Sequence, residues 1–148
     1  MIRTFSDKRY IYSVDMMISY IRLNEPTSTK IDVDDLLHNL KIDNWGNPFK
    51  KKYYSPLTVI RNPKRYKKQY YKIKNAELSF PIIISPKMSI IDGVHRLSKS
   101  YLLKNKTIKA YIFNDSLLKK FIIAKANEWD KVNKMQMYQF IEKFAKKF

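Results

Sequence analysis

Residues 89–103 read SIIDGVHRLSKSYLL, a short apolar strand that turns at Gly93 into a helix. The chain has only two glycines, Gly46 and Gly93, so a glycine at this turn is informative. Glycine permits a tight turn and lets a ligand approach the backbone closely. The helix that follows presents unpaired N–H groups and a partial positive charge at its N-terminus. The sequence therefore predicts an anion site at this turn.

The charged residues around Gly93 indicate which anion the turn would bind. His95 and Arg96 fall in the first turn of the helix, where positive charge is unfavourable unless a negative group binds. A phosphate matches both the N–H groups and the guanidinium fork, so we predict phosphate binding by Gly93, Val94, His95 and Arg96. A purely structural interpretation stays open. In it Asp92 caps the helix, Gly93 is a turn residue, His95 packs at the surface, and Arg96 is solvated or pairs with Asp92.

The sequence around this motif predicts an α+β fold. Strands are expected at 81–84, 89–91 and 107–113, with a helix over 93–105 between the last two. Upstream we expect a strand at 9–13, helices at 14–23 and 33–41, a turn at 44–48, a helix starting at Ser55-Pro56 and another from Pro63 to about Lys74.

Downstream, Asp115 or Ser116 is expected to cap C-terminal helices. Their apolar stripes are Leu117, Leu118, Phe121 and Ile122, and then Met137, Phe140, Ile141 and Phe144. We predict one compact domain over 1–148 with a small mixed sheet and flanking helices. Its phosphate-binding core spans about 76–113, and a helical extension spans about 115–148.

Composition limits the possible chemistry. The 148 residues include no cysteine, which excludes disulfides, thiolate nucleophiles and cysteine-based zinc sites, and only two histidines, His38 and His95. No apolar run approaches a membrane span, and the N-terminal MIRTFSDKRY lacks the apolar core of a signal peptide. We therefore expect no membrane partner and an intracellular, reducing location such as the cytoplasm or nucleoid.

The chain is strongly basic, with 30 Lys and Arg against 13 Asp and Glu and a net charge of +17. An excess of this size attracts polyanions. Residues 50–74 hold ten of these cations and no acid, interleaved with tyrosines. We predict contact with DNA or RNA through Lys50, Lys51, Lys52, Arg61, Lys64, Arg65, Lys67 and Lys68. The alternative is a solvated helix face whose tyrosines pack on the core.

The segment PIIISPKMSIIDGVHRLSKSYLLKNKTIKAYIF, residues 81–113, resembles the core of the ParB/sulfiredoxin-like superfamily. In that superfamily a strand pair leads into a D-G-x-H-R-type motif, an amphipathic helix and a further strand. Asp92, Gly93, His95 and Arg96 match the motif, with Leu97 and Tyr101 on the buried helix face. The strong match covers about a quarter of the chain, and 12–15, 25–26 and 75–81 fit only loosely.

What the resemblance implies depends on the branch. Sulfiredoxins need a cysteine where this chain has Val94, so sulfinic-acid reduction is excluded. The partition-protein branch binds and hydrolyses CTP, but its phosphate motif is richer in arginine and it carries a separate DNA-binding domain. The free-serine kinase branch has the D-G-x-H-R form most similar to this sequence. There the motif holds nucleotide phosphates, and acidic residues serve as base and metal ligand.

These considerations favour an enzyme, an NTP-dependent phosphotransferase or NTPase that acts on or near nucleic acid and uses ATP or CTP with Mg²⁺. Asp92 and Glu77 are the candidate catalytic carboxylates, and Asp92 is also the candidate metal ligand. Asp15 and Glu25 are further candidates. One alternative is a non-catalytic DNA- or RNA-binding protein that uses Lys50–Lys74. Another is a metal-dependent nuclease, although no carboxylate cluster clearly supports it.

Overall fold

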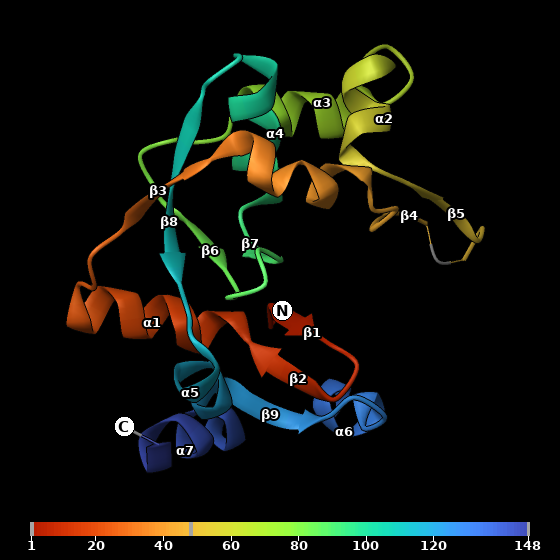
Figure 1. Ribbon diagram of the computed structural model, residues 1–148. Helices are drawn as coiled ribbons and strands as arrows, with labels where there is room; N and C mark the ends of the chain where they lie inside the picture. The colour runs from red at the N-terminus through yellow and green to blue at the C-terminus, as the bar shows by residue number, and fades with distance from the viewer. Residues whose placement is uncertain (1, 48, 148) are drawn as a thin grey trace. The chain divides into compact units, whose positions relative to one another are not determined.

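The computed structural model describes residues 2–47 and 49–147. Its contacts divide the chain into two compact units: unit 1 comprises Met1–Thr27 and Phe113–Phe148, and unit 2 comprises Ser28–Ile112. Both units combine helices with short strands, so the predicted α+β class is confirmed (Figure 1). The phosphate-binding core expected over 76–113 belongs to unit 2 except for its last residue. That residues 1–148 form a single domain stays a prediction.

Unit 2 is built on a four-stranded mixed sheet in the order β3-β8-β6-β7. Its strands are β3 (Thr29–Asp32), β6 (Ile82–Ile84), β7 (Ile90–Asp92) and β8 (Thr107–Ile112). β6 runs parallel to β8 and antiparallel to β7, and β3 pairs antiparallel with β8. The three strands predicted here are confirmed. β3 was not predicted, because it is a mostly exposed edge strand without an alternating apolar pattern.

Unit 2 also contains four helices: η1 (Val33–Lys41, a 3₁₀ helix), α2 (Pro56–Arg61), α3 (Lys67–Lys74) and α4 (Val94–Leu102). α4 contacts η1, α2 and α3 as well as the sheet. Leu36, Leu40 and Leu97 are buried with the apolar residues of β6 and β8, and they form the main core. α2 begins as predicted, because the Ser55 hydroxyl accepts from the Thr58 N–H.

Some predicted bounds in unit 2 are wrong. The turn expected at 44–48 is instead β4 (Trp45–Asn47), which pairs with β5 (Lys52–Tyr54) and sets the Trp45 ring edge-on to Tyr54. Pro48 lies outside the described residues. α3 starts at Lys67 because two turns that bond back to the Asn62 carbonyl precede it. α4 ends at Leu102, and Lys104 takes a left-handed φ of 58° that stops the helix.

A buried asparagine fixes the hairpin that leads into α4. Asn39, in η1, is 3% exposed. Its Nδ2 donates to the Met88 carbonyl at 2.9 Å, and its Oδ1 accepts from the Ile90 N–H at 2.9 Å. These bonds join segments about fifty residues apart and hold the start of β7. β7, the strand just before Gly93, is therefore anchored by a helix as well as by its own sheet.

We expect Asn39→Ala to lower the free energy of unfolding by about 1–3 kcal/mol, because it leaves the buried Ile90 N–H and the partly buried Met88 carbonyl without their side-chain partner. Denaturant unfolding monitored by circular dichroism measures the loss. Asn24→Ala is the matched control, since the Asn24 amide only donates to the Tyr20 carbonyl at an exposed site. Equal stabilities of the two variants would contradict the anchoring role.

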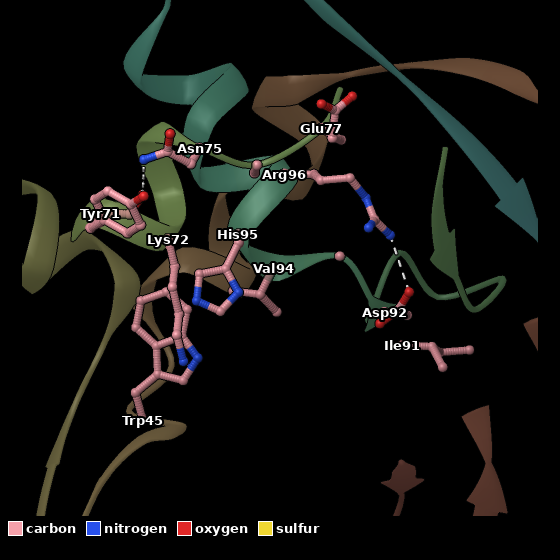
Figure 2. A pocket seen from close by; sticks show the side chains of 12 residues that line it. Trp45, Tyr71, Lys72, Asn75, Glu77, Ile91, Asp92, Val94, His95 and Arg96 are labelled. Atoms are coloured by element: carbon pink, nitrogen blue, oxygen red, sulfur yellow. Dashed lines mark hydrogen bonds and ion pairs between the residues drawn. The ribbon is translucent and has the colours of Figure 1, made fainter. Parts of the chain in front are cut away.

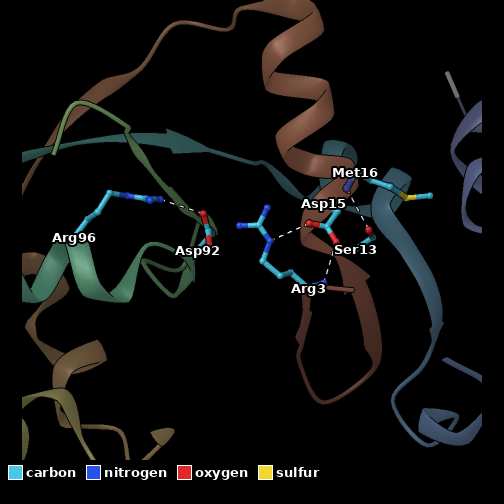
Figure 3. Close-up of polar contacts among 6 residues, drawn as sticks. All are labelled: Arg3, Ser13, Asp15, Met16, Asp92 and Arg96. Carbon is cyan, nitrogen blue, oxygen red and sulfur yellow. Dashed lines mark hydrogen bonds and ion pairs between the residues drawn. The ribbon is translucent and has the colours of Figure 1, made fainter. Parts of the chain in front are cut away.

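Unit 1 contains a three-stranded antiparallel sheet in the order β1-β2-β9. Its elements are β1 (Thr4–Ser6), β2 (Tyr10–Ser13), α1 (Val14–Asn24), α5 (Asp115–Leu118), η2 (Lys119–Phe121), β9 (Ile122–Lys125), α6 (Trp129–Asn133) and α7 (Met137–Lys147). β2 and α1 confirm the predictions for 9–13 and 14–23. The Ser13 hydroxyl caps α1 by accepting from the Met16 N–H (Figure 3).

Three expectations for the C-terminal extension are wrong. Asn114, not Asp115 or Ser116, caps α5. Ile122 begins a strand rather than continuing a helical stripe, because β9 pairs with β2 more than a hundred residues earlier. α7 forms where expected, but Met137 and Ile141 are exposed and only Phe140 is buried.

No helix in residues 2–47 and 49–147 is long and apolar enough to cross a bilayer.

Candidate functional site

A cavity of about 550 Å³ opens in unit 2 at the turn between β7 and α4 (Figure 2). Its wall includes every residue predicted for the nucleotide site: Glu77, Asp92, Gly93, Val94, His95 and Arg96. The structure thus brings the motif together with Glu77, which is fifteen or more residues away along the chain. Trp45 and the α3 residues Tyr71 and Lys72 also line the wall.

Gly93 holds a left-handed backbone, with φ of 106°, as the N-cap of α4. No side chain caps this helix end, so the prediction that Asp92 caps it is wrong; Asp92 lies in β7, paired with Ile83. A Cβ at position 93 would lie 2.6 Å from Ile82 Cγ2 and 2.8 Å from Arg96 Nη2. Only glycine fits both the backbone conformation and the space at this turn.

Arg96 folds back across the turn. Its Nη2 donates to Asp92 Oδ2 at 3.1 Å, and the two side chains are 21% and 24% exposed (Figures 2 and 3). The negative group that the sequence required beside Arg96 is therefore supplied within the chain, as the structural interpretation proposed. One donor is still unpaired, because Arg96 Nε is buried and has no hydrogen-bond partner within the described part of the chain.

His95 is held by two elements that are distant in sequence. Its ring stacks on Trp45 of β4, with centroids 4.7 Å apart and planes 20° apart, and its Nε2 lies 2.8 Å from Gln69 Oε1 of α3. The amide oxygen accepts, so Nε2 carries the proton. Burial lowers the pKa of His95, and the nearby charges of Lys72 and Arg96 lower it further. The lowered pKa favours the neutral ring at pH 7, and in this arrangement its one N–H donates to Gln69 Oε1 and not to a ligand.

Glu77 reaches the cavity because the segment after α3 is tied to α4. Lys99 Nζ donates to the Ala76 carbonyl at 2.8 Å. Glu77 itself is exposed, and its Oε2 accepts from the Ser79 hydroxyl at 3.3 Å. Figure 2 shows its carboxylate at the end of the cavity where Arg96 lies. Both candidate catalytic carboxylates therefore line the cavity, and among residues 2–47 and 49–147 only Asp92 of the two has an ion-pair partner.

The other predicted residues lie elsewhere. The eight cations predicted to contact nucleic acid are all exposed, and the wall of this cavity includes none of the eight. Asp15 belongs to unit 1, where it accepts from both Nε and the backbone N–H of Arg3 (Figure 3). Glu25, also in unit 1, ends α1 with a left-handed φ of 44°. The described residues contain no group of three or more His, Asp and Glu placed to hold a metal ion.

Several wall residues were missed from the sequence. Lys72 and Tyr71 lie within the basic stretch, but nothing there separates them from its other lysines and tyrosines. Trp45 lies in the stretch expected to be a turn, and it stacks on His95. Gln69, which does not line the wall but bonds to His95, has no sequence signal, because its role depends on α3 packing against α4.

No protein-family model, curated protein or solved structure matches this chain. The resemblance to ParB/sulfiredoxin-like domains therefore stays a prediction carried by the residues of the motif. The function of the cavity must be argued from its own geometry.

We expect Gly93→Ala to destabilise the fold by at least about 2 kcal/mol, through the strained φ and the contact with Ile82. Chemical denaturation provides the measurement. Lys104→Gly makes the opposite change at another left-handed position and should be neutral or slightly stabilising. A Gly93→Ala protein as stable as wild type would show that the turn tolerates a side chain.

His95 makes stability depend on pH. Folding lowers its pKa from the ordinary value of 6.5, so the unfolded chain binds the proton more readily. The contribution of His95 is therefore fully present above pH 6.5 and is lost as the pH falls from there through the folded pKa. Between pH 7.5 and 5.5 the free energy of unfolding of wild type should fall, and His95→Gln should reduce this fall. A His95→Gln slope equal to that of wild type would contradict the assignment.

Proposed function

We propose that the protein binds a nucleoside triphosphate in the Gly93 cavity and acts as an NTP-dependent phosphotransferase or NTPase on or near nucleic acid. The observation that carries this proposal is the composition of one cavity wall. The uncapped N-terminus of α4, Lys72, His95 and Arg96 gather there with two carboxylates, Asp92 and Glu77.

Electrostatics supports phosphate as the ligand. The first turn of α4 contains no acid and presents its free N–H groups to the cavity. Lys72 and Arg96 add two full positive charges, and only the Asp92 carboxylate is paired with one of them. The guanidinium also has unused hydrogen-bonding capacity, because its buried Nε has no partner in the described residues. A phosphate oxygen that displaces Asp92 from the guanidinium forms a charge-assisted bond.

The same wall supplies groups for phosphoryl transfer. In the proposed step a hydroxyl oxygen of the acceptor attacks the terminal phosphorus, and the bond from that phosphorus to the bridging oxygen breaks. A nucleoside diphosphate leaves, the acceptor carries the phosphoryl group, and the hydroxyl proton passes to the carboxylate of Glu77 or Asp92. With water as the acceptor the products are nucleoside diphosphate and phosphate. The α4 N–H groups and Arg96 stabilise the charge on the phosphoryl oxygens.

Mg²⁺ fits this donor set. A carboxylate beside a phosphate is repelled unless a cation lies between them, and Mg²⁺ is commonly held by one or two carboxylates together with phosphate oxygens. Asp92 and Glu77 are the residues that would hold it. When bound it would neutralise charge on the phosphate oxygens. An intracellular, reducing location remains part of this proposal.

Exposure of the predicted nucleic-acid residues favours a second candidate function. The eight cations of Lys50–Lys68 all face solvent, with no acid between them in the sequence. A non-catalytic nucleic-acid-binding protein would use this surface and would be indifferent to Arg96. Its binding to DNA or RNA would fall steeply with salt. Metal-dependent nuclease activity receives no comparable support.

Thermal unfolding with ATP, CTP, GTP and ADP in the presence of Mg²⁺ tests the nucleotide site. A nucleotide at about 100 times its dissociation constant stabilises the fold by about 2.7 kcal/mol, a Tm rise of roughly 5 °C or more for a chain of this size. We expect this rise in wild type and its loss in Arg96→Ala. Each variant is compared with its own nucleotide-free form, so a change in basal stability does not matter.

Arg61→Ala is the matched control, because it removes an exposed arginine of the same unit that does not line the cavity. It should respond to nucleotide as wild type does. If Arg96→Ala also responds normally, or if wild type does not respond to millimolar nucleotide, the site assignment fails and the second candidate function takes its place.

A further inference from the structure

A second cavity, of about 490 Å³, lies along α3. Its wall consists of Pro63, Lys67, Tyr70, Tyr71, Lys74 and Asn75. Tyr71 and Asn75 also line the Gly93 cavity, so the two cavities meet at these residues. In Figure 2 the Tyr71 ring lies on one side of His95 and Asp92 lies on the other. A ligand longer than a nucleotide can therefore follow α3 to the edge of the first cavity.

The chemistry of this surface is set by helical spacing. Lys67, Tyr70, Tyr71 and Lys74 fall at positions i, i+3, i+4 and i+7 and so share one face of α3, about 10 Å long. The opposite face packs inward, where Ile73 is fully buried and Gln69 bonds to His95. Of the tyrosines in this stretch, Tyr66 lies against Tyr54, whereas Tyr71 is 68% exposed.

An exposed tyrosine between lysines matches one ligand class. Lysines neutralise backbone phosphates, and an aromatic ring stacks on a base only when that base is unpaired. Lys74 Nζ already lies 5.9 Å from the centre of the Tyr70 ring, so this tyrosine supports the cation beside it. The stretch 50–74 contains no acid that would repel a polyanion.

We propose that the α3 face formed by Lys67, Tyr70, Tyr71 and Lys74 binds single-stranded nucleic acid, and that the strand passes Tyr71 at the edge of the nucleotide cavity. This inference rests on the proposed function, and it narrows the substrate of that function to an unpaired strand. DNA and RNA strands share the phosphates and base faces that this surface recognises.

Fluorescence anisotropy on the full chain, without nucleotide, tests the surface. The probes are short labelled single strands of DNA and of RNA, and the corresponding duplexes, each titrated over a range of salt. We expect single strands to bind more tightly than duplexes. Whichever of the DNA and RNA strands binds more tightly is identified as the preferred nucleic acid. Tyr71→Ala should weaken binding roughly 5- to 150-fold through loss of stacking. Lys67→Ala with Lys74→Ala should reduce the slope of log K against log salt by about 1.4.

Two matched controls separate this face from the general charge of the protein. Lys30→Ala with Lys109→Ala removes the same charge from an exposed cross-strand pair of unit 2. Tyr138→Ala removes a ring that is 62% exposed on α7. Both control variants should bind the labelled single strands with the wild-type affinity. The proposal would be overturned if the controls lost as much affinity for single strands as the α3 variants do, or if duplexes bound as tightly as single strands. Either result would indicate general attraction of the basic protein for polyanions.

The two proposals fail separately. Strand binding that depends on Tyr71, in a protein whose Tm does not respond to nucleotide, supports the α3 surface and overturns the nucleotide site. A normal nucleotide response, with strand binding that is absent or indifferent to Lys67, Tyr71 and Lys74, overturns the α3 surface and leaves the nucleotide site intact.

Discussion

The left-handed turn at Gly93 is the constraint on which the site depends. β7 ends and α4 begins within one residue, and the space at that residue is filled by the Ile82 side chain and the Arg96 guanidinium. Because Gly93 has no side chain, this space is open to the Arg96 guanidinium, which folds back over the turn to reach Asp92. The same turn leaves the first N–H groups of α4 without a side-chain cap. A tight turn and an open helix end are thus two consequences of one glycine.

The surrounding elements convert this turn into a cavity. α4 packs between η1, α2 and α3, and it is tied to the chain on both sides: Asn39 holds the hairpin before it, and Lys99 holds the segment that carries Glu77. α3 then contributes Lys72 to one side of His95, while Trp45 covers the ring. Burial of His95, together with the positive charges of Lys72 and Arg96 beside it, lowers the pKa of His95 and favours its neutral ring.

The sequence predicted what depends on neighbouring residues and missed what depends on distant ones. The apolar run Ile82–Ile84, the glycine turn and the Ser55 cap are local patterns, and each forms where expected. β9 could not be foreseen, because its strand character comes from pairing with β2 across most of the chain. Trp45 and Gln69 are site residues only because β4 and α3 meet α4 in space. The role of Asp92 could not be decided from the sequence either. An aspartate just before a helix is equally suited to cap that helix and to pair with an arginine in its first turn, and only the structure shows that Asp92 pairs with Arg96.

The Asp92–Arg96 pair bears on how the site would respond to a ligand. A partly exposed ion pair contributes on the order of 1 kcal/mol or less, because water solvates both partners almost as well when they separate. A phosphate that reaches Arg96 gains charge-assisted bonds to the guanidinium and to the α4 N–H groups together, so it competes easily with a single carboxylate. Displacing Asp92 in this way leaves that carboxylate beside the phosphate without its cation, where it attracts a divalent ion or accepts a proton. Under the proposed function, the internal ion pair would keep the cavity ordered before binding, and its weakness would free Asp92 for the chemistry proposed for it.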